Sequence, residues 1–148
     1  MHQTDMVKYK KLFNKRPVNA KEKSMKKYNV LGIGNAVVDV ISQSSDLFLD
    51  KMNIEKGIMQ LVDRDRGELL YKSMDNRRQA PGGSVANTIA GIGELGLKTG
   101  FIGKVGNDDL GNFYRSTMEE KGTDFLNELI DESELPTSRS MIFVSDDG

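Results

Sequence analysis

The amino-acid sequence predicts an α/β fold, and two features of the chain support this prediction. Short segments rich in apolar and β-branched residues, such as residues 28–34 and 139–145, alternate with longer segments whose apolar residues recur at helical spacing. Cap residues or glycines stand at the ends of the helical segments. The alternation of strands with helices is typical of α/β proteins and not of all-β proteins.

The chain from residue 28 to residue 63 predicts two strands with a short helix between them. YNVLGIG (28–34) mixes apolar and β-prone residues, and AVVDVIS (36–42) extends the same strand. SSDLFLDKMNIEKG (44–57) opens with cap residues and closes on a glycine, which indicates a short helix. IMQLVD (58–63) then predicts a second strand.

Two longer helices are predicted next. The first begins at Asp63, which can cap it, and runs to about Asn76. Its apolar face consists of Leu69, Leu70 and Met74. The second begins near Ser84 and ends at Gly96. Its apolar residues recur at spacings of three and four, and they are Val85, Ile89, Ile92 and Leu95.

The last part of the chain continues the same alternation. TGFIGKVG (99–106) predicts a strand, and DDLGNFYRSTMEEKG (108–122) predicts a helix that ends on a glycine. RSMIFVS (139–145) predicts the final strand. The sequence contains no internal repeat and no low-complexity tract.

The composition disfavours several classes of function. The 148 residues include no cysteine, so the chain forms no disulfide and offers no thiolate ligand or nucleophile. The single histidine, His2, lies in a basic N-terminal segment, so acid–base chemistry falls to Asp, Glu, Lys or Tyr. No apolar run approaches the roughly 20 residues of a membrane helix. These features favour a cytoplasmic protein that does not span a membrane.

Residues 1–27 differ in kind from the rest of the chain. They carry nine Lys or Arg residues against Asp5 and Glu22, and they lack a sustained apolar period. We interpret them as a disordered basic arm, and Met25 is an alternative start of the chain. Basic arms bind nucleic acid in some proteins, but no aromatic or groove-reading motif accompanies these lysines. A nucleic-acid partner is therefore disfavoured.

Two glycine patterns suggest nucleotide binding but do not fit their context. GIGELG (91–96) matches GxGxxG, yet dinucleotide-binding proteins place this motif between a strand and a helix, whereas this copy lies in the second half of a predicted helix. GIGNAV (32–37) follows a strand but lacks the third glycine. The phosphate-loop patterns GxxxxGKS and GxxxxGKT do not occur.

Gly82 and Gly83 occupy a different position, directly before the helix that begins near Ser84. Paired glycines allow a left-handed backbone or a close approach to a ligand. A helix N-terminus presents free amides, and the side chain of Asn87, one turn into the helix, can face the same point. The alternative is a tight strand-to-helix turn in which Asn87 is only solvated.

Asn35 and Asp39 form a second polar pair. Their even spacing places both side chains on one face of an extended strand. A carboxylate among valines costs several kcal/mol unless it is hydrogen-bonded, and the vicinal hydroxyls of a sugar supply such hydrogen bonds. The alternative is an aspartate on an edge strand that faces water.

Three motifs in this order resemble the N-terminal half of a carbohydrate kinase of the ribokinase, or pfkB, family. They are YNVLGIGNAVVDV, PGGSVANTIAGIGELG and TGFIGKVGNDDLGNFY. The spacing of Asn35 and Asp39, with KGIMQLVD after them, is most similar to bacterial adenosine kinase-like proteins. Val85 departs from the Gly, Ala or Pro of many members. The resemblance covers residues 28–148 and implies a Rossmann-like α/β ribokinase fold, here truncated, with a small β lid.

The resemblance implies that the motif residues bind the substrate. Asp39 binds ribose hydroxyls in this comparison, and Asn35 lines the same pocket. Gly82, Gly83 and Asn87 hold the sugar at the helix N-terminus.

The resemblance also implies a substrate class, cofactors and a partner. The implied reaction transfers a phosphoryl group from ATP, with Mg²⁺, to an alcohol of a sugar or nucleoside. Gln60, in the lid-like strand, is implied to lie near the base or ring. Asp108 matches an acidic turn position, which we interpret as a helix cap. The lid strands of this family also mediate dimers, which suggests a homodimer.

The catalytic part of the family pattern does not occur in this sequence. The family carries a GAGD-type motif, whose aspartate is the general base beside an anion hole, followed by the ATP site. We therefore expect a truncated or split kinase chain that leaves apolar sheet surface exposed. A catalytically inactive fragment, or a sugar-binding or interaction module, is the alternative.

Overall fold

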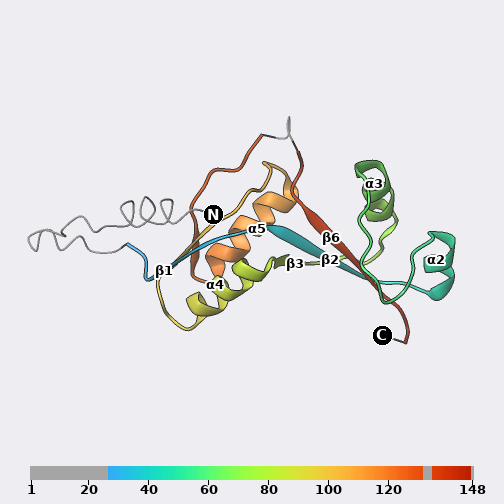
Figure 1. The fold of residues 1–148 in the computed structure, drawn as a ribbon, viewed down its shortest axis with the longest axis horizontal. Coiled ribbons are helices and arrows are strands. Elements are labelled where there is room, and N and C mark those ends of the chain that lie inside the picture. The colour runs from blue at the N-terminus through green and yellow to red at the C-terminus, as the bar shows by residue number, and fades with distance from the viewer. Residues whose placement is uncertain (1–26, 132–134, 148) are drawn as a thin grey trace, which may run out of the picture.

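The computed structural model describes residues 27–131 and 135–147, and it shows a mixed α/β fold with two three-stranded sheets (Figure 1). The predicted basic arm lies outside the described residues except for Lys27. Sheet A is parallel and has the order β1 (Val30–Ile33), β4 (Thr99–Ile102), β5 (Thr123–Phe125). Sheet B has the order β3 (Arg78–Gly82), β2 (Val37–Gln43), β6 (Arg139–Val144). Strand β2 runs antiparallel to β3 and parallel to β6.

The predicted helices are all present, with shorter bounds than predicted at most ends. They are α2 (Asp46–Lys51), α3 (Arg64–Ser73), α4 (Ser84–Glu94) and α5 (Asp109–Glu120). Helix α4 contacts β1 and β4, and α5 contacts β5, so both cover the same sheet. Figure 1 shows α2 and α3 at the opposite end of the molecule, beside sheet B.

The predicted single strand from residue 28 to residue 42 is two strands in different sheets. Strand β1 pairs with β4, whereas β2 pairs with β3 and β6. Residues 34–36 carry the chain from one sheet to the other. At this crossing Gly34 lies against helix α4, where a Cβ on Gly34 would be 2.9 Å from the Cβ of Val85. Apolar composition alone did not reveal this change of sheet.

The predicted strand at residues 58–63 is wrong. This segment is a loop between α2 and α3, and it pairs with no strand among the described residues. Two strands were missed, β3 and β5. Strand β3 contains Pro81, which lacks a backbone donor and is tolerated because β3 lies at the edge of sheet B. Strand β5 has only three residues, so its sequence carries little periodic signal.

The core between sheet A and its helices contains an aromatic cluster. Phe101, Tyr114 and Phe125 are buried, and their ring centroids lie 6.1 to 6.3 Å apart. The opposite face of sheet A is open among the described residues, where Leu31 is 55% and Ile33 is 74% exposed. The expected exposed apolar sheet surface is therefore present, although parallel sheets usually have both faces covered.

Asp108 joins the turn before α5 to the start of β6. Its Oδ1 accepts hydrogen bonds from Gly111 N and Thr137 Oγ1, both at 2.8 Å, and its Oδ2 accepts from Thr137 N at 2.7 Å. Thr137 Oγ1 also accepts from Gly106 N at 2.9 Å. The structure confirms that Asp108 caps the helix, and it adds a connection between sheet A and sheet B.

Gly93 brings helix α4 close to sheet A. A Cβ on this residue would lie 2.9 Å from Thr99 Oγ1 and from Thr123 Oγ1. The two hydroxyls are buried and hydrogen-bonded to each other at 2.9 Å. The helix therefore has no room for a side chain at this position.

Replacing Gly93 tests this close packing. Gly93→Ala is expected to lower the free energy of unfolding by about 1–3 kcal/mol, because the added methyl group must displace buried atoms. Gly91→Ala is the matched control in the same helix, since its Cβ meets nothing within 4 Å. The helix propensity of alanine is expected to raise the free energy of unfolding there by about 0.5–1 kcal/mol. Urea unfolding followed by circular dichroism measures both, and equal changes would contradict the packing.

The pH dependence of stability tests the Asp108 connection. Burial by itself raises the pKa of Asp108, but the hydrogen bonds from Thr137 and Gly111 outweigh burial and hold the pKa below its usual value. A lowered folded pKa stabilises the protein above the usual pKa of about 4, and this stabilisation is lost as pH falls through the folded pKa. Asp108→Asn is therefore expected to unfold at lower urea concentration than the wild type at neutral pH, with a difference that shrinks in acid.

The control for this measurement is Asp109→Asn, because Asp109 is exposed in the same turn and does not cap the helix. Its effect is expected to be limited to the exposed helix-dipole interaction of about 0.3–1 kcal/mol. A difference between Asp108→Asn and the wild type that stayed constant from neutral pH to acid would refute the assignment.

Candidate functional site

Asp39 lies in the middle of β2 on the opposite face from the buried valines. Side chains alternate along a strand, and Val38 and Val40 are fully buried while Asp39 is partly exposed. Its register partners are Ala80 in β3 and Ser140 in β6. The sheet therefore presents this carboxylate on a face that solvent reaches.

The carboxylate of Asp39 lies over Gly82, the last residue of β3. A Cβ on Gly82 would be 2.6 Å from Asp39 Oδ2 and 2.9 Å from Asp39 Cγ. Gly82 is buried, so a side chain here would have to displace the carboxylate. The glycine thus lets backbone and carboxylate meet.

Gly83 follows and turns the chain into helix α4. Its φ of 106° is in the region that favours glycine, and a Cβ would clash with the carbonyl oxygen of Asn35. Helix α4 has no side-chain hydrogen bond at its N-cap, and Asn87 N donates to Gly83 O at 2.9 Å. The amides of the first helical turn therefore remain for another acceptor.

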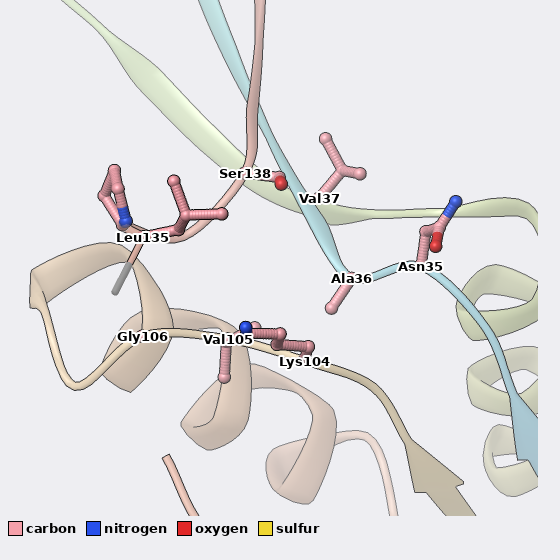
Figure 2. Close-up of a pocket in the computed structure, with 9 residues that line it drawn as sticks. Asn35, Ala36, Val37, Lys104, Val105, Gly106, Leu135 and Ser138 are labelled. Atoms are coloured by element: carbon pink, nitrogen blue, oxygen red, sulfur yellow. The ribbon is translucent and has the colours of Figure 1, made fainter. Parts of the chain in front are cut away.

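Asn35 connects this turn to a neighbouring cavity. It lies between β1 and β2 and is exposed. The cavity has a volume of about 350 Å³. Figure 2 shows that three segments converge on it: residues 35–37, residues 104–106 and residues 135–138. The cavity lies where the chain passes between the two sheets.

Tyr114 lies behind the glycine turn. It is fully buried on α5, and its Oη donates a hydrogen bond to the carbonyl oxygen of Gly82 at 3.0 Å. Burial, and secondly the negative charge of Asp39, raises the pKa of Tyr114 to about 12. The phenol therefore stays neutral and acts as a donor at physiological pH.

The structure brings most of the predicted site residues together. Asp39 contacts Gly82, and the Asn35 carbonyl contacts Gly83. Asn87 is exposed one turn farther along α4. Their roles in binding stay predictions, but their proximity is a property of the fold.

Gln60 lies elsewhere. It is exposed in the loop between α2 and α3, and it lines a second cavity of about 310 Å³ together with Leu70, Arg139 and Met141. No contact between Gln60 and the other five predicted residues is found in the described part of the chain. The strand that was expected to carry it is a loop.

Sequence reasoning missed Tyr114. Its only signal is its helical spacing with Leu110 and Met118, which indicates a buried face of α5. The hydrogen bond to Gly82 joins residues 32 positions apart, so no local sequence pattern predicts this contact.

The described residues form no preassembled cluster of metal ligands. No group of three or more His, Asp or Glu side chains is placed to hold a metal ion among them. In the same part of the chain, no helix combines the length and the apolar character that crossing a membrane requires.

Comparison with known proteins identifies the family. Residues 49–148, more than half of the chain, match the pfkB family of carbohydrate kinases. The chain belongs to this family. The resemblance seen in its motifs is thus confirmed, and kinases of this family use ATP as the phosphoryl donor.

Solved structures of kinases share the fold. The adenosine kinase from Sinorhizobium meliloti is 45% identical with a TM-score of 0.69, over 82% of this chain and 37% of that chain. A probable sugar kinase from Rhizobium etli CFN 42 is 41% identical with a TM-score of 0.70, over 84% of this chain and 37% of that chain. The α/β ribokinase-like fold is therefore confirmed.

A curated relative is a sugar kinase by name. The fructokinase from Salmonella typhimurium is 35% identical over 81 residues, which are 55% of this chain and 26% of the fructokinase. The chain thus spans about a quarter of this relative and little more than a third of the two solved kinases.

Proposed function

We propose that this chain forms the alcohol-binding part of a sugar or nucleoside kinase. The observation that carries the proposal is the contact between the Asp39 carboxylate and Gly82, next to the Gly83 turn and the uncapped N-terminus of α4. The carboxylate accepts hydrogen bonds, while amides at a helix N-terminus donate them. A pair of neighbouring hydroxyls, each both donor and acceptor, matches this arrangement.

The proposed substrate is an adenosine- or ribose-like alcohol. In a ribose ring the two vicinal hydroxyls lie on one side, so one carboxylate can accept from both. Asn35 and Asn87 border the same turn and supply further polar groups. These residues would bind and orient the alcohol for phosphoryl transfer from ATP with Mg²⁺. The nucleotide site and the general base would come from outside the residues described here.

Gln60 is proposed to contact the part of the substrate that lies beyond the sugar hydroxyls. It stands on a loop with Ile58, Met59 and Leu61, all exposed. Loops change position on binding more readily than strands, and this loop borders β6, the neighbour of β2. The loop conformation of Gln60 is compatible with such a role.

Substrate binding by the full chain tests the proposal. Isothermal titration with adenosine, ribose and fructose is expected to show binding of at least one of them. Asp39→Asn is expected to weaken that binding about 10- to 100-fold, because hydrogen bonds to a charged group contribute about 1.5–3 kcal/mol. Asp50→Asn is the control, since Asp50 is exposed on α2, and it is expected to bind like the wild type.

Two results would contradict this assignment. One is a folded wild-type chain that binds none of the three compounds. The other is unchanged affinity in Asp39→Asn. Incubation with ATP and Mg²⁺ adds a separate readout, because binding without turnover is the outcome expected if the chain supplies only the substrate-binding part.

We further propose that sheet B mediates a homodimer. The loop at residues 58–63, between α2 and α3, borders the edge strand β6 of this sheet. In this loop Met59 is 82% and Leu61 is 93% exposed. Exposed apolar patches of this kind commonly mark interaction sites.

Analytical ultracentrifugation tests the dimer. The wild type is expected to sediment as a dimer, and a chain with both Met59→Lys and Leu61→Lys as a monomer, because the charges oppose burial of the loop. Leu95→Lys, at an equally exposed apolar position after α4, is expected to remain dimeric. A monomeric wild type would exclude this interface.

A further inference from the structure

The hydrogen bond from Tyr114 to Gly82 connects the aromatic core with the proposed substrate site. Tyr114 contacts Phe101 and Phe125 through its ring, and its Oη reaches the last residue of β3 at 3.0 Å. Packing of the ring needs no hydroxyl. The hydroxyl therefore has a role at Gly82 that is separate from the role of the ring in the core.

The geometry of the peptide bond extends the effect of this hydrogen bond to Gly83. The peptide between Gly82 and Gly83 is planar and trans, so its carbonyl and its N–H point in opposite directions. A donor that fixes the Gly82 carbonyl toward Tyr114 therefore fixes the Gly83 N–H away from Tyr114. Glycine has few steric limits on its own backbone angles. The direction of the Gly83 N–H therefore depends on contacts with neighbouring residues, such as the hydrogen bond from Tyr114 to the Gly82 carbonyl.

Three contacts restrain the turn from different sides. The Asp39 carboxylate lies over Gly82, the Asn35 carbonyl lies against Gly83, and Tyr114 binds the Gly82 carbonyl. The first two contacts exclude side chains but leave the rotation of the peptide plane less restricted. Pairing of Gly82 with Val37 and the hydrogen bond from Asn87 N to the Gly83 carbonyl act on the backbone as well. A hydrogen bond is directional, and Tyr114 supplies a directional restraint on the Gly82 carbonyl from the side of the core.

We propose that Tyr114 is a positioning residue for the substrate site: its buried hydroxyl orients the Gly82–Gly83 peptide so that the Gly83 N–H faces the substrate alcohol. This inference rests on the proposed function, because it assigns Tyr114 to the same site. The residue acts through the backbone and does not touch the substrate. Its hydroxyl stays protonated and donating across the physiological range, since burial and the charge of Asp39 raise its pKa to about 12.

Tyr114→Phe removes only the hydroxyl and keeps the ring. It is expected to weaken binding of the compound that the wild type binds, among adenosine, ribose and fructose, by about tenfold, the equivalent of one hydrogen bond. It is also expected to shift the Gly83 amide cross-peak in ¹H–¹⁵N spectra of the ligand-free chain. Titration calorimetry and these spectra measure the two effects.

Two controls separate positioning from stability. Phe125→Leu disturbs the same aromatic cluster but leaves the hydroxyl, so it is expected to lower stability with wild-type affinity of the folded chain. Tyr71→Phe removes a hydroxyl that accepts a 3.5 Å hydrogen bond from Gln79 Nε2, away from the Gly82–Gly83 turn, and it is expected to change neither affinity nor the Gly83 amide. If Tyr114→Phe folds poorly, the same measurements are made in a Gly91→Ala background, where the helix is stabilised.

The outcomes distinguish this inference from the proposed function. If Asp39→Asn loses binding while Tyr114→Phe binds like the wild type, the positioning role is refuted and the proposed function stands. If the wild type binds none of the three compounds, the proposed function fails and the positioning role fails with it. Weaker binding in Tyr114→Phe together with a moved Gly83 amide, and neither effect in Tyr71→Phe, supports the inference.

Discussion

The backbone contact between Gly83 and Asn35 is the constraint on which the arrangement of the two sheets depends. Asn35 lies where the chain leaves β1 of sheet A for β2 of sheet B, and Gly83 lies where it leaves β3 of sheet B for helix α4. The two crossings pack directly on each other, and any side chain at Gly83 would clash with the Asn35 carbonyl. A third crossing, from β5 to β6, is held by Asp108 and Thr137. A side chain at Gly83 would force the first two crossings to shift relative to each other.

The same constraint explains why polar groups gather at this point. Chain crossings leave backbone groups outside the ladders of both sheets, and an unpaired buried group costs about 1–3 kcal/mol. At the end of the β3 ladder, the Gly82 carbonyl accepts a hydrogen bond from Tyr114 in the core. On the open side it leaves the Asp39 carboxylate partly exposed and the N-terminus of α4 without a side-chain cap. A carboxylate that keeps contact with water avoids the larger penalty of full burial, so it remains able to exchange water for a ligand.

The sequence predicts the helices and most of this site because both depend on local patterns. Periodic apolar residues and caps such as Asp63 and Asp108 mark helices, and the paired glycines stand directly before α4 as predicted. The expectation that Asn35 and Asp39 share one strand is wrong, because β2 begins at Val37 and Asn35 lies in the crossing before it. The predictions fail where the structure of a segment depends on whether a neighbouring strand is available to pair with it. Residues 58–63 are as β-prone as a strand but pair with no strand in the described part of the chain, whereas β3 becomes a strand despite Pro81 because β2 lies beside it. Tyr114 was missed because its hydrogen-bond partner, Gly82, is distant in the sequence.

The names of the relatives divide between sugars and a nucleoside, and the proposed site is compatible with both kinds of alcohol. The Salmonella relative is a fructokinase, whereas the Sinorhizobium structure is an adenosine kinase. In the proposed site, Asp39, Gly82 and Gly83 would present one carboxylate and backbone amides, and such groups would bind neighbouring hydroxyls whatever group is attached to the rest of the ring. Discrimination among such alcohols requires contacts beyond the hydroxyls, because a group that both substrates share contributes equally to both affinities. In this fold the proposed hydroxyl site is built from strands and a helix end, whereas Gln60 stands on a loop, so under the proposal hydroxyl binding and substrate choice would fall to different kinds of element.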